Sequence, residues 1–510
     1  MRRYLRHRGD RLRQVSGDPI CDPAQTETLA AERLAAGRPV LRRSVGGEPR
    51  GVLCAMGVCF ECRIGPEQRR ACMEPVESRL SDRVAGALAE AISAVPEAPP
   101  YDLAVIGAGP AGIAAACAAA ESGKRVALLD EGLAPGGQIW RGGRVPPAWR
   151  ERLERSGVVS LDRATVFDLQ PGFAVQAERA GEPLQLKASA LVLATGAREL
   201  FLPFPGWTLP NVVGVGAVQA LLKAGLSFRD RRVVLAGSGP LLLPVAALLA
   251  EDGADVALVA EQSAPVDVAR FARSLWRWPG KLVEAARHRL SFPAARYRPG
   301  VWVVEALGDS RVREAVLTDG ERVFRERADI LGVSFGLLPN TELGELIGCE
   351  LEAGALRVGA RQETSVPGVF AAGEPTGVGG AELAAVEGFV AGFAAAGREA
   401  PVALLRRRES LRAFSRLLAS AFHPRPELRA LARPDTLLCR CEDVPLSALE
   451  PSWGARQAKL AARFGMGACQ GRTCGPAARF LFGWEGDSVR SPVKPASIGS
   501  LVGAHPGRAL

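Results

Sequence analysis

The stretch YDLAVIGAGPAGIAAACAAAESGKRVALLDE, residues 101–131, decides the fold. It predicts a buried strand over 101–106, three glycines in the spacing G-x-G-x-x-G, a helix of small residues and a second apolar strand over 126–129. The glycines are Gly107, Gly109 and Gly112. The first permits a tight turn, the second lets a pyrophosphate approach the backbone, and the third lets helix and strand pack closely. An acid follows in the place that binds an adenosine ribose, Asp130 or its neighbour Glu131, so the stretch predicts an α/β dinucleotide-binding unit.

Three further motifs indicate that the dinucleotide is FAD. The segments APGGQIWRGG (134–143), LVLATGARE (191–199) and VPGVFAAGEPTGVGGAELAAVEGFVAG (366–392) resemble motifs of flavoproteins with two dinucleotide-binding domains. These motifs are, in order, the second glycine loop, the strand that leaves the first nucleotide domain, and the closing motif. In the closing motif an acid binds the ribityl chain, and here it is Glu374 where Asp is usual. The residues predicted to contact FAD are Gly107, Gly109, Pro110, Ala111, Gly112, Asp130, Glu131, Gly137, Gln138, Arg141, Val166, Thr195, Gly196, Gly373, Glu374 and Gly380.

The stretch RRVVLAGSGPLLLPVAALLAEDGADVALVAE (231–261) predicts a second βα unit inserted in the flavin core. Gly237 and Gly239 match the fingerprint, but Leu242 occupies the third glycine position and should hold the helix further from the strand. Glu261 is the candidate ribose acid. Two interpretations stay open: a site for NAD(H) or another adenine nucleotide, and a retained fold without a ligand. No Cys-x-x-Cys lies near either flavin loop, which excludes a thioredoxin-reductase-like dithiol relay.

Eight of the eleven cysteines fall into two groups of four. The first group is Cys54, Cys59, Cys62 and Cys72. Three ligands on one loop and a fourth after a short hairpin resemble the plant-type ferredoxin arrangement around a 2Fe–2S cluster, with a shorter last gap. Gly57 suits a loop that folds its backbone over the cluster sulfides. Zinc is the alternative, but four-cysteine zinc sites usually come as two C-x2-4-C pairs, and this triplet does not divide that way.

The second cysteine group has the spacing C-x-C-x27-C-x4-C. Its members are Cys439, Cys441, Cys469 and Cys474. The group resembles the bacterioferritin-associated ferredoxin type of domain, a small helical fold that holds a 2Fe–2S cluster. Arg440 and Arg472 lie between the ligands and can lower the negative charge of a cluster, and Pro476 fits the first position of a helix facing it. Zinc is a stronger rival here, because C-x-C and C-x4-C pairs suit it.

The predicted fold class is therefore an α/β two-dinucleotide-binding-domain flavoprotein flanked by two cluster domains. The N-terminal one is expected to be β-grasp-like and ferredoxin-related, and the C-terminal one small and helical. The predicted boundaries are 1–92 for the ferredoxin-like domain, 93–100 for a Pro-rich linker, 101–425 for the FAD-binding core with the second unit at about 215–335, 426–490 for the C-terminal cluster domain and 491–510 for a tail without a motif.

The charge distribution and the longest uncharged segments argue against nucleic-acid binding and against membrane-spanning helices. The formal net charge is +9, but the basic residues are spread along the chain without a basic block interleaved with aromatics, which argues against nucleic-acid binding. The uncharged stretches 103–120 and 233–250 carry Gly and Pro at a strand-to-helix turn, so they are predicted as buried βα units and not as membrane helices. No signal peptide is expected. The expected compartment is the cytoplasm, with peripheral attachment at the inner membrane as the alternative.

The order of these motifs resembles the redox subunits of bacterial heteromeric amine and imino-acid dehydrogenases. That family includes the α subunits of D-hydroxyproline and proline dehydrogenases, the A subunit of opine oxidase and the FAD subunit of hydrogen cyanide synthase. The likeness is carried by GGQIWRGG, AGSGPLLLPVAALLA, GEPTGVGGAELAAVEGF and CRCEDV…GMGACQGRTCGP, and it covers nearly the whole chain from Tyr101 onward. The N-terminal domain resembles the small ferredoxin-like γ subunit of those complexes, here fused to α.

The resemblance implies that substrate is oxidised on a separate β subunit of D-amino-acid-oxidase type. This chain would then carry FAD and two 2Fe–2S clusters in a hetero-oligomer that acts on CH–NH or CH–NH2 donors. The sequence agrees, since no acid/base or carboxylate-binding set can be nominated and the catalytic residues stay unassigned. Two alternatives are open: a self-contained NAD(P)H-dependent reductase that feeds its own clusters, and a non-redox interaction module with zinc at both cysteine groups.

Overall fold

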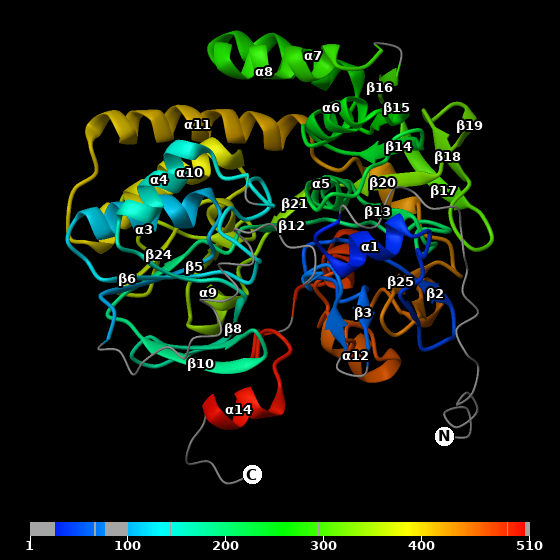
Figure 1. The fold of residues 1–510 in the computed structure, drawn as a ribbon. Helices are drawn as coiled ribbons and strands as arrows, with labels where there is room; N and C mark the ends of the chain where they lie inside the picture. Colours follow the sequence, from blue (N-terminus) through cyan, green and yellow to red (C-terminus); the bar gives the residue numbers. More distant parts are fainter. Residues whose placement is uncertain are drawn as a thin grey trace.

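The structure, a computed structural model, describes residues 26–65, 68–76, 100–142, 144–293, 296–486 and 488–504. The segments 1–25 and 77–99 lie outside the described residues, and with them the start of the predicted ferredoxin-like domain and nearly all of the predicted linker. Two layered α/β units lie side by side, and the two cysteine-bearing parts pack beneath the second unit (Figure 1).

The first unit is a five-stranded parallel sheet in the order β24–β11–β5–β6–β7. Its strands are β5 (Leu103–Ile106), β6 (Val126–Leu129), β7 (Val159–Leu161), β11 (Leu191–Leu193) and β24 (Val369–Ala371). The inner strands are runs of Val, Leu, Ile and Ala, and they are buried throughout, as a parallel sheet covered on both faces requires. Strand β6 has the predicted bounds. Strand β5 begins later than predicted, because Tyr101 forms only an isolated bridge with Ala188.

Helices α3 (Pro110–Glu121) and α10 (Gly380–Ala395) lie together on one face of this sheet (Figure 1). A Cβ added to Gly388 of α10 would lie 2.1 Å from the carbonyl oxygen of Ala111 in α3, so only glycine allows this crossing. The other face packs on an antiparallel sheet and a short helix. These are β8 (Ala164–Gln170), β9 (Ala174–Arg179), β10 (Glu182–Lys187) and α9 (Glu342–Leu346). The remaining elements of this half are α4 (Pro147–Arg155), β22 (Leu351–Glu352), β23 (Ala355–Leu356), η5 (Glu374–Thr376) and α11 (Val402–Ala421).

The second unit is also a five-stranded parallel sheet, in the order β13–β20–β14–β15–β16. Its strands are β13 (Val212–Gly214), β14 (Arg232–Gly237), β15 (Asp255–Glu261), β16 (Tyr297–Pro299) and β20 (Ile330–Ser334). An antiparallel sheet of β17 (Trp302–Leu307), β18 (Glu314–Thr318) and β19 (Val323–Arg327) and the helices α5 (Val215–Lys223) and α6 (Leu242–Asp252) pack around it. The antiparallel pair β12 (Ala197–Glu199) and β21 (Leu337–Pro339) connects the two units.

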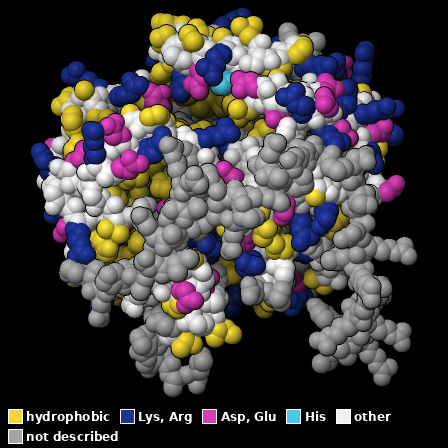
Figure 2. Space-filling view, viewed as in Figure 1, with side chains coloured by type: hydrophobic (Ala, Val, Ile, Leu, Met, Phe, Trp, Pro, Cys, Tyr) yellow, Lys and Arg dark blue, Asp and Glu magenta, His cyan; other side chains and the backbone are white. Residues whose placement is uncertain are grey.

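Helices α7 (Pro265–Ser274) and α8 (Pro279–Leu290), joined by the turn η3 (Leu275–Arg277), form the outer edge of the second unit (Figure 1). Neither helix has a buried residue. Figure 2 shows hydrophobic side chains next to basic ones over these helices, and the exposed hydrophobic residues there include Trp276, Val283 and Leu290. Exposed apolar side chains gathered on one helix pair are typical of surfaces that contact another molecule.

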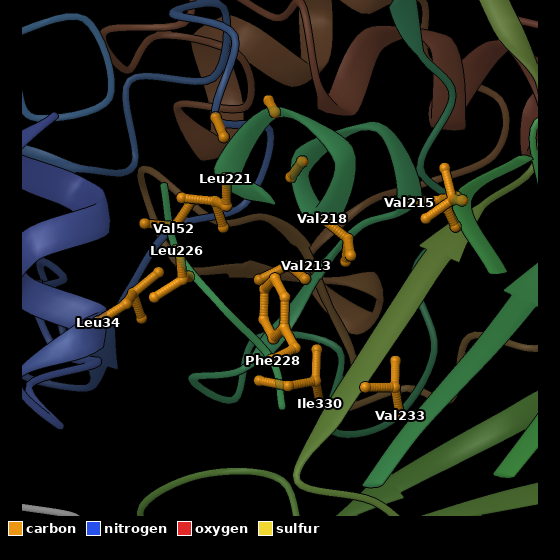
Figure 3. Packing of buried hydrophobic residues seen from close by; sticks show 14 of the residues in the cluster. Leu34, Val52, Val213, Val215, Val218, Leu221, Leu226, Phe228, Val233 and Ile330 are labelled. Carbon is orange, nitrogen blue, oxygen red and sulfur yellow. The ribbon is translucent and has the colours of Figure 1, made fainter. Parts of the chain in front are cut away.

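The N-terminal part shares its hydrophobic core with the second unit. It consists of α1 (Leu29–Ala35) and two short antiparallel pairs, β1 (Arg42–Arg43) with β2 (Pro49–Arg50) and β3 (Arg63–Ile64) with β4 (Arg69–Arg70). In the described part of the chain these pairs are separate and do not form the single sheet expected of a β-grasp domain. Leu34 of α1 and Val52 pack against Leu221 and Leu226 of the second unit (Figure 3).

The C-terminal part contains η6 (Pro426–Ala430), β25 (Leu437–Cys439), β26 (Val444–Pro445), η7 (Leu446–Ala448), α12 (Ala455–Ala462) and α13 (Cys474–Phe482). Helix α13 begins at Cys474, so Pro476 lies at the third helical position and not at the first. The segment predicted as a tail without a motif returns to the flavin unit before α14 (Ile498–Ala504), where the Val493 N–H donates to the Phe167 carbonyl at 2.8 Å. Among the residues described, no helix has the length and apolarity to cross a membrane.

Candidate functional site

The first glycine loop connects β5 to α3, and the structure explains each of its glycines. Gly107 has φ +104°, and a Cβ there would lie 2.2 Å from the Ala194 carbonyl oxygen. A Cβ on Gly112 would lie 1.7 Å from the Gly107 carbonyl oxygen. Gly109 differs, because a Cβ there would meet no atom within 4 Å. Gly107 and Gly112 therefore allow the chain to pack closely. Gly109 leaves open space before the helix N-terminus, where a pyrophosphate would bind.

The two candidate ribose acids have different partners. The Asp130 carboxylate accepts hydrogen bonds from the N–H groups of Ala108 at 2.5 Å and Gly132 at 2.7 Å, so it holds the glycine loop. Glu131 lies 2.7 Å from the Lys494 ammonium and 3.5 Å from the Arg70 guanidinium. Burial opposes the ionisation of Glu131, but Lys494 and Arg70 outweigh it and lower its pKa to about 2. Glu131 is therefore an ionised acid at this edge of the sheet.

A cavity lies at this edge and is lined by residues from several separate stretches of the chain. Its lining includes the predicted FAD residues Gly107, Asp130, Glu131, Val166 and Thr195. The other parts contribute Phe60 from the first cysteine loop, Arg472 from the second, and Val493 and Lys494 from the C-terminal segment. Sequence reasoning missed Lys494, because its contact with Glu131 joins residues that are far apart in the chain.

The second glycine loop and the closing motif also have the features that FAD requires. The Gly136 N–H donates to the Ala108 carbonyl at 2.7 Å, which stacks the second loop on the first. Glu374 accepts from the Gly380 N–H at 2.9 Å through one oxygen, while its other oxygen is buried without a hydrogen-bond partner among the described residues. Burial raises the pKa of Glu374 to about 7. An unpaired buried acceptor and open glycine positions at Gly109, Gly196 and Gly380 fit a ribityl chain and a pyrophosphate.

The predicted FAD residue Arg141 contacts the first cysteine region. Its guanidinium donates to the carbonyl oxygens of Ala55 at 2.6 Å and Cys72 at 2.7 Å, both in the first cysteine group's region. It also donates to the side chain of Gln138 at 3.1 Å. The second glycine loop is thereby tied directly to the first cysteine loop.

The four cysteines of the first group are buried and lie together in two pairs. The strongest side-chain interactions within the group join Cys54 to Cys59 and Cys62 to Cys72. The N–H groups of Met56 and Cys59 point at the Cys54 sulfur, each at 3.4 Å. Among the described residues, no three His, Cys, Asp or Glu side chains converge on one metal ion. Four buried cysteines gathered in this way are of the ligand type that a 2Fe–2S cluster uses.

The second group is equally buried, and its last member, Cys474, begins α13. The sulfur atoms of Cys441 and Cys469 are 3.7 Å apart, and the Cys439 thiol contacts those of Cys441 and Cys474. A Cβ on Gly467 would lie 2.2 Å from the Cys441 Cβ. The loop that carries Cys469 therefore passes tightly against Cys441. The helix N-terminus beside these sulfurs favours negative charge.

The two cysteine groups lie next to each other. Phe60, from the first cysteine loop, packs in the hydrophobic core of the C-terminal part with all four cysteines of the second group. Arg50 forms a 2.7 Å ion pair with Asp443, and the Gly46 N–H donates to the same carboxylate at 2.7 Å. The C-terminal part is anchored to the second unit as well, since the Trp207 indole donates to the Leu437 carbonyl at 2.7 Å.

The second nucleotide unit has its glycine loop covered by the chain itself. The Ser238 hydroxyl donates to the Phe422 carbonyl at 2.5 Å, and the Gln262 amide donates to the His423 carbonyl at 2.9 Å. A Cβ on Gly239 would lie 3.8 Å from the Phe422 Cβ, whereas the equivalent Gly109 position is open. The segment that follows α11 therefore lies where a nucleotide would approach this loop.

The predicted ribose acid of the second unit is enclosed. Glu261 is 1% exposed, and its two oxygens accept from the N–H groups of Gly239 and Ser263 at 2.8 and 2.9 Å. Burial raises its pKa to about 7. Helix α6 begins only at Leu242, the residue in the third glycine position, whereas α3 begins before Gly112. The end of α6 that would face a phosphate therefore begins later in the glycine motif than the end of α3 does.

Fold and site together define a flavoprotein with two dinucleotide-binding units and a 2Fe–2S domain. The family model of pyridine nucleotide-disulphide oxidoreductases matches residues 101–388, and that of the 2Fe-2S iron-sulfur cluster binding domain matches residues 21–81. The A subunit of opine oxidase from Agrobacterium tumefaciens is 34% identical, covering 80% of this chain and 93% of that protein. Hydrogen cyanide synthase subunit HcnB from Pseudomonas aeruginosa is 33% identical, covering 72% of this chain and 90% of that protein.

The chain therefore belongs to the pyridine nucleotide-disulphide oxidoreductases, in the group that contains HcnB and the A subunit of opine oxidase. Among solved structures, L-proline dehydrogenase from P. horikoshii has the same fold, with a TM-score of 0.64 over 93% of this chain and 94% of that chain at 19% identity. The predicted resemblance is confirmed, and the protein is an FAD-dependent oxidoreductase with an N-terminal 2Fe–2S domain.

Proposed function

We propose that this chain is the electron-transfer subunit of a heteromeric dehydrogenase that oxidises an amino acid, imino acid or opine on a separate flavoprotein subunit of D-amino-acid-oxidase type. The observation that carries the proposal is the continuous contact between the redox sites. Arg141 ties the second glycine loop to the first cysteine loop, and that loop contacts the second cysteine group. A flavin takes up two electrons at once, whereas iron–sulfur clusters pass electrons one at a time. The arrangement therefore suits a chain that accepts an electron pair and passes it on as single electrons.

The proposal assigns the residues that hold each group. The open space at Gly109 and the α3 N-terminus would receive the pyrophosphate, and Glu374 would accept a hydrogen bond from the ribityl chain. Glu131 would accept from the ribose hydroxyls, with Lys494 and Arg70 holding it ionised. The proposed iron ligands are Cys54, Cys59, Cys62 and Cys72 for one cluster and Cys439, Cys441, Cys469 and Cys474 for the other.

The second cluster is part of the proposal and has its own support. Its four cysteines are buried together, they contact one another in pairs, and α13 begins at Cys474. The burial of these sulfurs beside the first group favours a redox role over a separate structural site.

The alternative, a self-contained NAD(P)H-dependent reductase, has less support. It needs a nucleotide at the second unit, where the chain around Phe422 covers Gly239 and where Glu261 already has both oxygens bound. The names of the two relatives reported above point the same way, because each is called a subunit.

We expect NADH added to the purified chain without oxygen to leave the flavin absorbance unchanged. The physical reason is that a nucleotide would have to displace the segment after α11 and break the Ser238–Phe422 hydrogen bond. Glu261→Ala should keep full FAD content and lower the free energy of unfolding by about 1–3 kcal/mol, because the N–H groups of Gly239 and Ser263 lose their acceptors. Bleaching by NADH at a catalytic rate, slowed in Glu261→Ala, would instead establish the reductase.

The two-subunit proposal is tested by steady-state activity. Proline, hydroxyproline, sarcosine and an opine should each fail to reduce a dye when mixed with this chain alone. Activity with one of them should appear when the flavoprotein that co-purifies with this chain is added. Dye reduction by the chain alone, at the rate of the mixture, would refute a separate substrate-oxidising subunit.

A further inference from the structure

Glu61 links the two cysteine groups. It lies between Cys59 and Cys62 in the first cysteine loop and is 1% exposed. Its carboxylate is directed at the other group, with Oε1 3.9 Å from the Cys441 sulfur. The same oxygen is 2.9 Å from the Arg42 guanidinium, whose Nε also donates to the Glu61 carbonyl at 3.2 Å. A charged side chain of the first loop thus contacts a proposed ligand of the second cluster.

Arg440 has the reciprocal position. It lies between Cys439 and Cys441 in the second group and is 3% exposed. Its Nε is 3.5 Å from Glu61 Oε2, so each loop contributes one charge to a buried ion pair. The Arg440 guanidinium also donates to the Trp207 carbonyl at 2.8 Å and lies 4.9 Å from the centre of the Trp207 ring.

The geometry leaves the ion pair few other polar partners. Among the described residues, neither Glu61 Oε2 nor Arg440 Nε has a hydrogen-bond partner, so the 3.5 Å contact is what compensates these two buried atoms. A buried ion pair is weak support for stability, since apolar side chains of similar volume often serve as well. The feature of this ion pair that matters here is the position of its two charges, between the two cysteine groups. In a buried region each charge acts strongly on both neighbouring groups, because little water screens it.

We propose that the Glu61–Arg440 ion pair couples the two iron–sulfur sites, so that their reduction potentials are set together and one electron passes directly between them. The step is a one-electron transfer, in which the donating site is oxidised by one electron, the accepting site is reduced by one, and no bond forms or breaks. This inference rests on the second cluster of the proposed function. Both residues are positioning residues, since neither is itself a ligand of a cluster in the proposal.

The test is a redox titration of the purified chain followed by EPR spectroscopy. Glu61→Gln removes a negative charge, so it should raise the midpoint potentials of both clusters; Arg440→Gln removes a positive charge and should lower both. We expect each substitution to change the oxidised-to-reduced ratio at a fixed potential by about tenfold, which is 59 mV for a one-electron couple. Glu48→Gln, an exposed acid in the same N-terminal part, should leave both potentials in place.

A shift confined to one cluster, or shifts absent from both, would overturn the coupling. The unmodified chain provides a test that does not depend on variants folding. Its fully reduced EPR spectrum should show a magnetic interaction between the clusters that disappears in Cys59→Ser and in Cys469→Ser. A spectrum equal to the sum of two independent clusters would also overturn the inference. Iron analysis separates this failure from that of the proposed function, because two iron atoms per chain in place of four would refute the second cluster itself.

Discussion

Gly109→Val is expected to give a folded protein that contains no FAD. Gly109 has φ −73°, which any residue adopts, and a Cβ there meets no atom within 4 Å, so valine is accommodated without strain. The side chain would instead occupy the space before the α3 N-terminus. Losing two charge-assisted hydrogen bonds of about 1.5–3 kcal/mol each would weaken FAD binding about 100-fold or more. Flavin content of the purified variant, measured by absorbance after denaturation, gives the answer.

Two other glycines are matched controls for this substitution. Gly280→Val, at an exposed position in α8 with no atom near its Cβ, should retain full flavin. Gly112→Val should fail to fold, because its Cβ would lie 1.7 Å from the Gly107 carbonyl oxygen. Full flavin occupancy in Gly109→Val would mean that the flavin binds at another unit of the chain.

Cys59→Ser should remove only the N-terminal cluster, and Cys469→Ser should remove only the C-terminal cluster. The contacts among the thiols divide them into two separate groups, and no cysteine belongs to both. Iron content should therefore fall from about four to about two atoms per chain in either variant, and to about none in the double variant. Metal analysis combined with EPR spectroscopy measures both the number and the identity of the remaining cluster.

Cys349→Ser is the control for these variants. Cys349 is also buried, but it belongs to neither cysteine group and contacts Thr364. It should keep all its iron. Zinc at either site in the unmodified chain would refute the corresponding cluster. The same iron loss in Cys349→Ser would show that the effect of the other variants is general instability.

Much of the flavin unit could be predicted from the sequence because its signals are local. The apolar run that forms β6 and the glycines at 107, 109 and 112 each specify a strand or a turn within a few residues. Leu242 in a glycine position predicted a helix further from the strand, and this stays a prediction; the structure shows that α6 begins at Leu242, whereas α3 begins before its third glycine. The cysteine spacings were similarly informative, and each group is gathered in the structure.

The contacts between parts of the chain could not be predicted, because they join residues hundreds of positions apart. Arg141 was predicted from its place in the second glycine loop, and nothing in the sequence indicates that its guanidinium binds backbone carbonyls of the first cysteine region. Lys494 lies in a segment without a motif and pairs with Glu131. Phe422 covers the second unit from a loop that carries no nucleotide-binding pattern. No periodicity or spacing reports such contacts, since they depend on how folded surfaces meet.

Anaerobic mixing of amines with the purified chain, followed by absorbance, tests the electron-transfer role most directly. Arginine is abundant in this chain, and no single one is singled out as a grip for a substrate carboxylate. We predict that proline, hydroxyproline, sarcosine and an opine leave the flavin oxidised when the chain is alone. With the partner flavoprotein present, one of them should bleach the flavin and then reduce the clusters. Substrate-dependent bleaching at a catalytic rate without any partner would contradict this account.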